Sequence, residues 1–225
     1  LFLTDFEGKY ISSIDRIGGS KHNPRRIRDD GCAVQEDNVA VEFNIPPAVS
    51  VSSFLESINF NLSYLSTHAQ TLGLQLSITA SANFSEDQLN DMRAKEFGCE
   101  PDFNAWTTKQ NRLPHSDNPL LRSCGGHIHV GYLDLHPYEI VKAMDLFLGI
   151  PSVLMDEDSQ RRDLYGKAGA CRVKPYGVEY RTLSNFWLKN DKLKIWVYEQ
   201  TQEAVQWATE NPTWYDSRMA KKVQT

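Results

Sequence analysis

Four parts of this sequence each bring together two side chains that can bind a metal ion or a phosphate group. The pairs are Asp5 and Glu7, Glu36 and Glu42, His127 and His129, and Glu179 and Arg181. The members of each pair are an even number of residues apart, within a run that suits a β-strand. Because successive side chains of a strand point to opposite faces, we expect both members of a pair to share one face.

A sheet face that carries several carboxylates predicts metal-dependent chemistry. Carboxylates that lie close together repel one another and raise each other's pKa values, and divalent cations would relieve this repulsion. Oxygen ligands with few imidazoles suit Mg²⁺ or Mn²⁺ better than zinc. Such ions could hold a nucleoside triphosphate by its phosphates. Arg162, Arg172 and Arg181 could then neutralise a phosphoryl group during its transfer.

The histidine pair lies in the stretch 125–131, which begins and ends with glycine. The pattern indicates a strand in a crowded sheet, where glycines leave room for a close approach to the backbone. Two other interpretations of His127 and His129 stay open. They are one structural histidine beside a half-buried one, or the metal site of a hydrolase or cupin-like oxygenase. A cupin would need a carboxylate soon after the pair and a later third histidine, and Asp134 and His136 match this poorly.

Several alternating segments predict the strands that would position these pairs. Residues 34–45 have one apolar and one acidic face, either as a single strand or as two strands that meet at Asp37 and Asn38. The other expected strands cover residues 1–7, 10–14, 74–82 and 178–183.

Three segments predict helices. Ser50 is a typical helix cap, and an apolar stripe at helical spacing follows it as far as Ala69. Pro137 opens a second helix, which we expect to end near residue 158, and residues 193–207 form a third. Strands and helices together predict an α+β fold. The chain shows no internal repeat or linker, so we expect residues 1–225 to form one domain.

The composition narrows the possible classes of function. The 225 residues are 40% hydrophobic, enough for a sizeable core, and the net charge of −5 provides no basic field for nucleic acid. No apolar stretch is long enough to span a bilayer, and no signal peptide is visible. The four cysteines show no CxxC spacing, which favours reduced thiols in the cytoplasm. Leu1 already lies in an expected strand, which suggests that native residues precede it.

The polar pairs, in their order along the chain, resemble the motifs of the glutamine synthetase and glutamate–cysteine ligase superfamily. These motifs are Asp5-Phe6-Glu7, Glu36 with Glu42-Phe43-Asn44-Ile45, Gly125-Gly126-His127-Ile128-His129 and Glu179-Tyr180-Arg181. The closer resemblance is to the phage-associated branch, the carboxylate–amine ligases of type 2. Segments 35–47 and 180–184 carry that closer resemblance, which extends over residues 5–187.

This resemblance implies a glutamine synthetase-like catalytic domain. A curved antiparallel sheet would form a funnel, with helices on its outer face and no separate β-grasp domain. ATP and Mg²⁺ (or Mn²⁺) would lie in the funnel. The implied ligands of one metal ion are Asp5, His127 and Glu179, and those of another are Glu7, Glu36 and Glu42. The implied nucleotide contacts are His129, Lys167 and Asn44. The implied stabilisers of the phosphoryl group are Arg172 and Arg181.

The implied activity is ATP-dependent ligation of a carboxylate to an amine through an acyl phosphate. The expected partners are small molecules or peptides that carry these groups, rather than nucleic acid or a membrane, and a homo-oligomer stays open. The expected compartment is the cytoplasm, that of the host if the protein is phage-encoded. Two alternatives are the hydrolase or oxygenase built on His127 and His129, and a relative that binds nucleotide without turning it over.

Overall fold

The computed structural model describes residues 1–95, 102–131 and 134–211, and the fold is that of these residues. They form an α+β fold with antiparallel strand pairs, which confirms the fold class expected from the sequence. The chain divides into two compact units. Among the described residues, unit 1 holds 1–95 and 118–124, and unit 2 holds 102–117, 125–131 and 134–211. The single domain expected over residues 1–225 stays a prediction.

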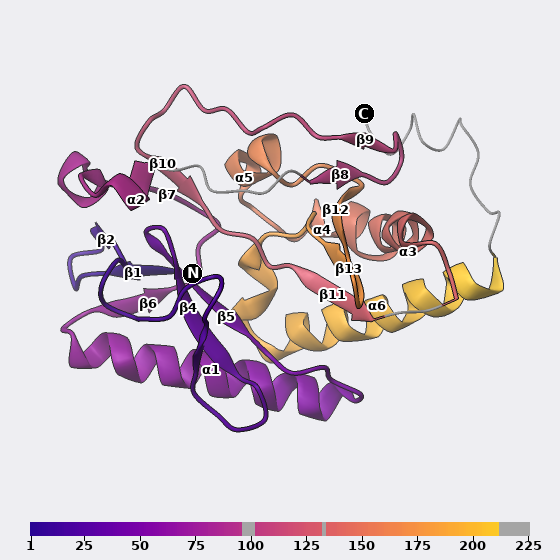
Figure 1. The fold of residues 1–225 in the computed structure, drawn as a ribbon, viewed down its shortest axis with the longest axis horizontal. Helices are drawn as coiled ribbons and strands as arrows, with labels where there is room; N and C mark the ends of the chain where they lie inside the picture. The colour runs from indigo at the N-terminus through magenta and orange to yellow at the C-terminus, as the bar shows by residue number, and fades with distance from the viewer. Residues whose placement is uncertain (96–101, 132–133, 212–225) are drawn as a thin grey trace. The chain divides into compact units, whose positions relative to one another are not determined.

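Unit 1 consists of small antiparallel sheets and one long helix (Figure 1). Its strands are β1 (Phe2–Thr4), β2 (Tyr10–Ile11), β3 (Arg25–Arg26), β4 (Ala33–Asp37), β5 (Ala40–Asn44), β6 (Gln75–Ser77), β7 (Ser81–Asn83) and β10 (Leu121–Ser123). They pair in the orders β2-β1-β6, β3-β4-β5 and β10-β7. Its helical segments are α1 (Val51–Thr71), the 3₁₀ turn Glu86–Leu89 and α2 (Met92–Lys95).

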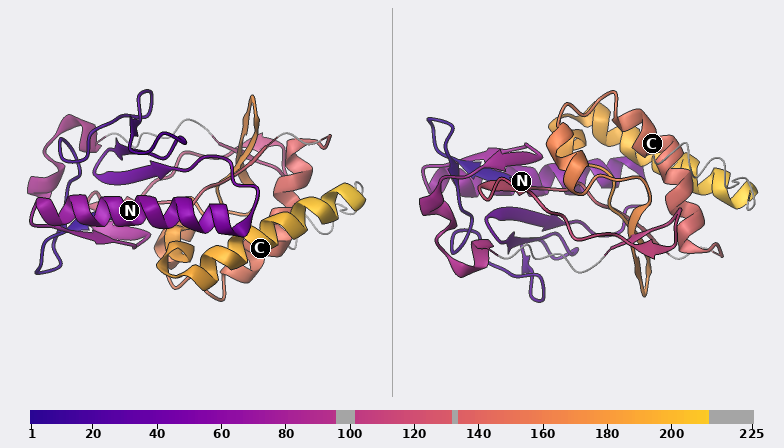
Figure 2. Two further views of the ribbon diagram at one scale, coloured as in Figure 1. Left: turned by 90° about the horizontal axis from the view of Figure 1, so that it is seen from below. Right: turned by 90° about the horizontal axis from the view of Figure 1, so that it is seen from above.

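The helix α1 begins where the sequence predicts. The Ser50 hydroxyl accepts a hydrogen bond from the backbone N–H of Ser53, and the Ser53 hydroxyl accepts one from the backbone N–H of Ser50. This reciprocal cap satisfies N–H groups that a helix start leaves without intrahelical partners. The predicted apolar stripe supplies the buried residues Ile58, Leu65 and Ala69, and α1 packs along β6 (Figure 2).

The segment 34–45 forms two strands, one of the two arrangements expected, and its pairing corrects a prediction about Glu36 and Glu42. β4 and β5 join through a tight turn at Asn38, which has a positive φ of 54°. Gln35 pairs with Glu42, and Glu36 pairs with Val41. Because paired residues share a face and neighbours along a strand alternate, Glu36 and Glu42 point to opposite faces. Their even spacing misleads because the two-residue turn changes the parity of the second strand.

The structure also corrects two other strand predictions in unit 1. The strand β1 ends at Thr4, so Asp5 and Glu7 lie in the turn that follows and do not share a strand face. Asp5 Oδ1 instead accepts hydrogen bonds from the backbone N–H groups of Glu7 and Lys9, at 3.0 and 2.8 Å. Such a turn is a typical use of aspartate. The single strand expected over residues 74–82 is two strands, β6 and β7, in different sheets.

Unit 2 is built on a five-stranded antiparallel sheet of order β11-β13-β12-β8-β9. Its strands are β8 (Phe103–Asn104), β9 (Lys109–Gln110), β11 (Ile128–Gly131), β12 (Ala170–Lys174) and β13 (Gly177–Tyr180). Its helical segments are α3 (Pro137–Met144), the π-helical segment Asp145–Gly149, α4 (Ile150–Ser152), α5 (Ser159–Leu164), the 3₁₀ turn Asn185–Lys189 and α6 (Asp191–Glu210).

The sheet of unit 2 has one apolar face and one polar face. Ile128, Val178 and Tyr180 are buried on the apolar face, where α3 packs on β12 and β13 and α6 packs on α3 (Figure 1). The next residues along the strands, such as His129 and Glu179, therefore lie on the polar face. This alternation places the candidate chemistry on one side of the sheet and the hydrophobic core on the other.

The second predicted helix is shorter than expected. After Met144 the chain forms a π turn, in which the Ile150 N–H donates to the Asp145 carbonyl, and α4 ends at Ser152. Pro151 provides a physical reason, because proline lacks an N–H and its ring conflicts with the carbonyl four residues earlier in a regular helix. The third predicted helix is present as α6.

Two further expectations concern the chain as a whole. Within the described ranges, no helix is both long enough and apolar enough to cross a membrane. Cys32, Cys124 and Cys171 are buried free thiols, in agreement with the expectation of reduced cysteines. Cys99 lies outside the described residues.

Candidate active site

The polar face of the unit 2 sheet carries a row of three side chains on adjacent strands. His129 of β11 pairs with Glu179 of β13, and Glu179 pairs in turn with Arg172 of β12. The strand register therefore brings three predicted site residues together, although more than forty positions separate His129 from the other two in the sequence. Neighbouring strands lie about 4.8 Å apart, so side chains in such a row are close enough to share a ligand.

Glu179 is the centre of a group of cationic side chains. Its carboxylate forms an ion pair with Arg181, and lies 3.7 Å from Arg172 Nη1 and 3.4 Å from Lys174 Nζ. Both Glu179 and Arg181 are buried, with 4% and 5% of their surface exposed. A buried charge is stable only when opposite charges and hydrogen bonds compensate its loss of hydration. The three cations supply this compensation for Glu179.

Arg181 is held from several sides. Its Nε lies 3.4 Å from Asp102 Oδ2, and its Nη1 contacts Glu179. Behind it, the buried guanidinium of Arg161 donates to the carbonyl oxygens of Arg181 and Thr182, at 3.2 and 3.1 Å. The backbone N–H of Arg181 donates to the Ala170 carbonyl at 2.9 Å. Both the side chain and the main chain of Arg181 are thus fixed by neighbouring groups.

His127 completes the group, just before β11. Its Nδ1 lies 3.2 Å from Glu179 Oε1 and 3.3 Å from Arg181 Nη1. The glycines before it have a steric purpose. A Cβ on Gly125 would come within 2.3 Å of His127 Nε2, and a Cβ on Gly126 within 2.3 Å of Trp187 Nε1. The space expected above these glycines is therefore filled by the protein's own His127 and Trp187 rings.

The electrostatics of the group follow from burial and from the arginines. Burial, together with the positive charge of Arg181, lowers the pKa of His127 to about 3, so this imidazole is neutral at pH 7. Burial by itself would raise the pKa of Glu179, but the hydrogen bond with His127 and the charges of Arg181 and Arg172 hold it well below its ordinary value. At neutral pH the group thus combines an ionised carboxylate, three cations and a neutral histidine.

His129 has a different partner from His127. Its Nδ1 lies 2.6 Å from the Tyr176 hydroxyl, and the two rings stack with their centroids 5.9 Å apart. Tyr176 lies in the turn that joins β12 and β13. Burial lowers the pKa of His129, as do Lys174 and Arg181, against the opposing effect of Glu179. The two histidines, which the sequence places on one face, therefore serve separate contacts.

The remaining predicted residues of unit 2 do not contact Glu179 in the same way. The Arg162 guanidinium donates to the Asp156 carbonyl at 2.8 Å, and it is the neighbouring Arg161 that donates to the backbone carbonyl of Arg181. The Lys167 side chain is exposed, and its carbonyl accepts a hydrogen bond from the Thr182 hydroxyl at 3.1 Å. The roles predicted for Arg162 and Lys167 stay predictions.

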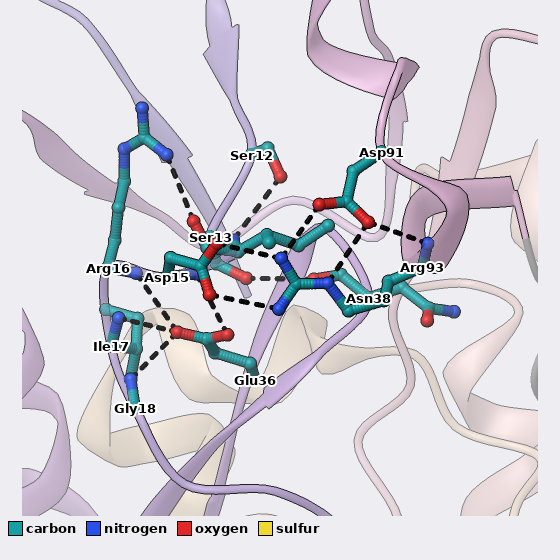
Figure 3. A network of polar contacts seen from close by, with 11 residues as sticks. Ser12, Ser13, Asp15, Arg16, Ile17, Gly18, Glu36, Asn38, Asp91 and Arg93 are labelled. Atoms are coloured by element: carbon teal, nitrogen blue, oxygen red, sulfur yellow. Dashed lines mark hydrogen bonds and ion pairs between the residues drawn. The ribbon is translucent and has the colours of Figure 1, made fainter.

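In unit 1, Glu36 is engaged in holding a loop. Its Oε1 accepts hydrogen bonds from the backbone N–H groups of Arg16, Ile17 and Gly18, at 3.0, 3.0 and 2.8 Å, and its Oε2 accepts one from Asp15 at 3.0 Å (Figure 3). Figure 3 also shows the Arg93 guanidinium between the carboxylates of Asp15 and Asp91. A metal ion at Glu36 would have to compete with these four N–H donors.

Glu42 and Asn44 lie on the other face of the same hairpin. Gln35 bridges them, because its Nε2 donates to Glu42 Oε2 at 2.8 Å and its Oε1 accepts from Asn44 Nδ2 at 3.4 Å. The metal and nucleotide roles predicted for these residues, as for Asp5 and Glu7, are not tested by this arrangement. Across the described residues, three or more His, Cys, Asp or Glu side chains nowhere form a group that could hold a metal ion.

The fold and the site define an α+β protein whose antiparallel sheet gathers cationic side chains round a buried carboxylate. Residues 119–208 match the model of one protein family, described as phage phiEco32-like COOH.NH2 ligase-type 2. The match confirms the family expected from the motifs over that stretch, which is less than half of the 225 residues. The family name describes a carboxylate–amine ligase. No curated protein and no solved structure matches the chain.

Four residues of the site were missed by the sequence interpretation: Asp102, Arg161, Lys174 and Tyr176. Lys174 could have been found, because Arg172 and Lys174 are two apart in an alternating run and share a strand face. Tyr176 could also have been found, because it lies in the turn that joins β12 and β13. Asp102 and Arg161 carry no local signal, since only the tertiary fold brings them to Arg181.

Proposed function

We propose that this protein is an ATP-dependent carboxylate–amine ligase that uses Mg²⁺ or Mn²⁺ and forms an amide bond through an acyl phosphate. The observation that carries the proposal is the gathering of Arg172, Lys174 and Arg181 round Glu179 on one sheet face. All four side chains lie within residues 119–208, the part of the chain that matches the ligase family.

The charges of this group suit a polyphosphate. The carboxylates of Glu179 and Asp102 offset only part of the positive charge of Arg172, Lys174 and Arg181. Electrostatic attraction is stronger at a partly buried site than in bulk water, because the local dielectric constant is lower. Arginine also presents several N–H donors in a plane, which matches the oxygens of a phosphate group. The group therefore supports binding of an anion such as a nucleotide phosphate.

The proposed reaction has two steps. A substrate carboxylate attacks the γ-phosphorus of ATP, the bond to the β-phosphate oxygen breaks, and an acyl phosphate and ADP form. The nitrogen of the amine then attacks the acyl carbon, the bond to the phosphate oxygen breaks, and an amide and inorganic phosphate form while the amine loses a proton. Both steps spread negative charge over phosphate oxygens, so fixed cations lower their barriers.

The residues of this chain have distinct proposed roles. Arg172 and Arg181 stabilise the phosphoryl group in transfer, with Lys174 beside them. Arg181 is already fixed by Glu179 and Asp102, so it needs little reorganisation as charge develops. His129 is paired through Nδ1 with Tyr176, which leaves Nε2 as the nitrogen for a phosphate oxygen.

The fit to a metal ion is weaker than the fit to an anion. Glu179 is ionised and His127 is neutral, which are the forms that bind metals. Within either unit, however, the described residues provide no set of three ligands. We therefore propose that Mg²⁺ enters as part of the Mg–ATP substrate, and that Glu179 and the neutral His127 are the side chains that would add to its phosphate and water ligands. Bound there, it would neutralise charge on the phosphates.

The proposal also covers the funnel-shaped architecture of the sheet and the substrates. The polar face of β11, β13 and β12 would form part of the inner wall of a glutamine synthetase-like funnel, with α3 and α6 on the outside. The substrates would be small molecules or peptides, one with a carboxylate and one with an amine.

Isotope transfer tests the proposal directly. The protein is incubated with Mg–ATP and pools of ¹⁸O-labelled carboxylates and unlabelled amines, and ADP, phosphate and amide are measured. An acyl phosphate passes one carboxylate oxygen to the released phosphate, so ¹⁸O should appear there. Arg172→Ala should abolish most turnover, while Arg112→Ala, at an exposed arginine, should retain it.

Two results would contradict the proposal. One is an unchanged melting temperature in the presence of both ATP and Mg²⁺, because a ligand that binds the folded state must stabilise it. The other is a tightly bound zinc or iron ion that is lost equally in His127→Ala and His129→Ala, since this would favour a hydrolase or oxygenase.

A further inference from the structure

The carboxylate of Asp145 lies behind the segment that carries Glu179, at the end of β13, and Arg181, just after it. Asp145 begins the π-helical segment that follows α3, and it is completely buried. Buried carboxylates are uncommon because loss of hydration is costly unless several donors replace the water. This one accepts hydrogen bonds from side chains of two other parts of unit 2.

Two of the donors flank Arg181 in the sequence. The Tyr180 hydroxyl donates to Asp145 Oδ1 at 2.8 Å, and the Thr182 hydroxyl lies 3.4 Å from the same oxygen. Because side chains alternate along an extended chain, Tyr180 and Thr182 point to the opposite side from Glu179 and Arg181. Asp145 thus holds the residues before and after Arg181 from the side away from the cationic group.

The third donor comes from the segment that holds Asp102. Trp106 Nε1–H donates to Asp145 Oδ2 at 2.6 Å. Asn104 lies between Asp102 and Trp106 in the sequence, and its Oδ1 accepts a hydrogen bond from the backbone N–H of Trp106 at 2.9 Å. Asp102, four residues before Trp106, is the second carboxylate partner of Arg181. Asp145 is therefore hydrogen-bonded both to the two residues that flank Arg181 and to the segment that holds Asp102, the partner of Arg181.

The π turn gives this arrangement its close fit. A Cβ on Gly149, at the end of the π segment, would lie 2.7 Å from the Tyr180 hydroxyl and 3.1 Å from Asp145 Oδ1. The Thr182 hydroxyl also reaches the Lys167 carbonyl at 3.1 Å, which connects the turn before β12 to the same set of contacts. π turns within helices occur often at functional sites.

We propose that Asp145 is a positioning residue for the cationic group: by fixing Tyr180, Thr182 and Trp106, it sets where the Arg181 guanidinium lies between Glu179 and Asp102. Asp145 touches no reacting group itself. The inference rests on the proposed function only for its kinetic consequence, because the position of Arg181 can be measured without turnover.

The test compares Asp145→Ala with Asp145→Asn. Alanine removes both side-chain acceptor oxygens. Asparagine keeps one oxygen to accept from Trp106, and its amide N–H₂ can donate a hydrogen bond to the Tyr180 hydroxyl oxygen. We expect Asp145→Ala to lower kcat by about 10- to 100-fold with KM for ATP changed less than about threefold, because a small misplacement acts on the transition state. Asp145→Asn should restore kcat to within about threefold of the unaltered protein.

A spectroscopic measurement makes the result independent of activity. In ¹H–¹⁵N NMR spectra, the Arg181 Nε–H signal is identified by its disappearance in Arg181→Lys. We expect this signal to be sharp and slowly exchanging in the unaltered protein and in Asp145→Asn, and lost or shifted in Asp145→Ala. Ile140→Ala, at a buried apolar position of α3, is the matched control for general loss of packing. It should leave both the signal and kcat unchanged.

The outcomes separate this inference from the proposed function. A protein that never turns over ATP, but whose Arg181 signal moves in Asp145→Ala and not in Ile140→Ala, would contradict the ligase and support the positioning role. An Arg181 signal that is the same in Asp145→Ala and in the unaltered protein would overturn the positioning role. If Asp145→Ala does not fold, Tyr180→Phe combined with Thr182→Val gives the same two outcomes through the same signal.

Discussion

Replacing Glu36 by glutamine tests whether this carboxylate holds the loop of residues 15–18. The change keeps the shape of the side chain and one oxygen, which can still accept from Arg16, Ile17 and Gly18. It removes the negative charge and places an amide N–H₂ against the backbone N–H of Asp15. One hydrogen bond is therefore lost and three are weakened.

The expected cost follows from these four bonds. A hydrogen bond to a charged acceptor is worth about 1.5–3 kcal/mol, against about 0.5–1.5 kcal/mol for a neutral pair. Loss of about 1 kcal/mol at each of the four bonds gives about 4 kcal/mol, which we halve because solvent screens this half-buried site. Glu36→Gln should thus lower the free energy of unfolding by about 2 kcal/mol, or Tm by about 4–8 °C.

Two measurements check this expectation. Thermal unfolding gives the change in Tm, and amide hydrogen exchange gives the protection of residues 15–18, which should fall in Glu36→Gln before the rest of unit 1 changes. Glu42→Gln is the matched control, because Glu42 lies on the opposite face of the same hairpin. If both variants lower Tm equally, or if the exchange of residues 15–18 is unaffected, Glu36 is not the anchor of this loop.

Three further predictions concern unit 2. Arg181→Ala should preserve ATP binding and remove most turnover, so a retained kcat with a raised KM in steady-state assays would show a purely ground-state role. His127→Ala should weaken metal affinity, and excess Mg²⁺ should partly restore its activity. His129→Ala should instead raise KM for ATP, with no restoration by Mg²⁺. If Mg²⁺ and ATP titrations give the same result for both variants, the two histidines do not have separate roles. Burial raises the pKa of Asp145 from 3.8 to about 6. The folded state therefore keeps this proton to higher pH than the unfolded state, and the free energy of unfolding should fall by about 2 kcal/mol as pH rises from 4 to 6, relative to Asp145→Asn in denaturant titrations. A flat difference over that range would show that Asp145 titrates normally.

The sequence predicts the local features of this protein well. The cap at Ser50 and the shared face of Glu179 and Arg181 depend on neighbours in the chain, which periodicity and capping residues reveal. The hairpin within residues 34–45 is one of the two arrangements that the sequence left open. The motif around His127 also led to the family that residues 119–208 match.

Features that depend on exact register or on tertiary contacts were harder to predict. One turn residue at Asn38 decides whether Glu36 and Glu42 share a face, and alternation alone gave the wrong answer. The short strand β1 and the π turn at Asp145 depend on packing against other elements. The choice between Arg161 and Arg162 as the buried arginine depends on one position along α5, which the sequence does not determine.

The alignment of His129, Glu179 and Arg172 across three strands has a consequence for how the sheet assembles. A slip of one residue between β11 and β13 would turn Glu179 into the apolar layer and bring Val178 or Tyr180 to the solvent side. Gly177 opposes the same error, because it has a positive φ of 154° and a Cβ there would lie 2.0 Å from the Val130 carbonyl oxygen. Mispaired chains would therefore be both unstable and without the cationic group. The register that builds the charged row is thus the same register that disfavours a misfolded sheet.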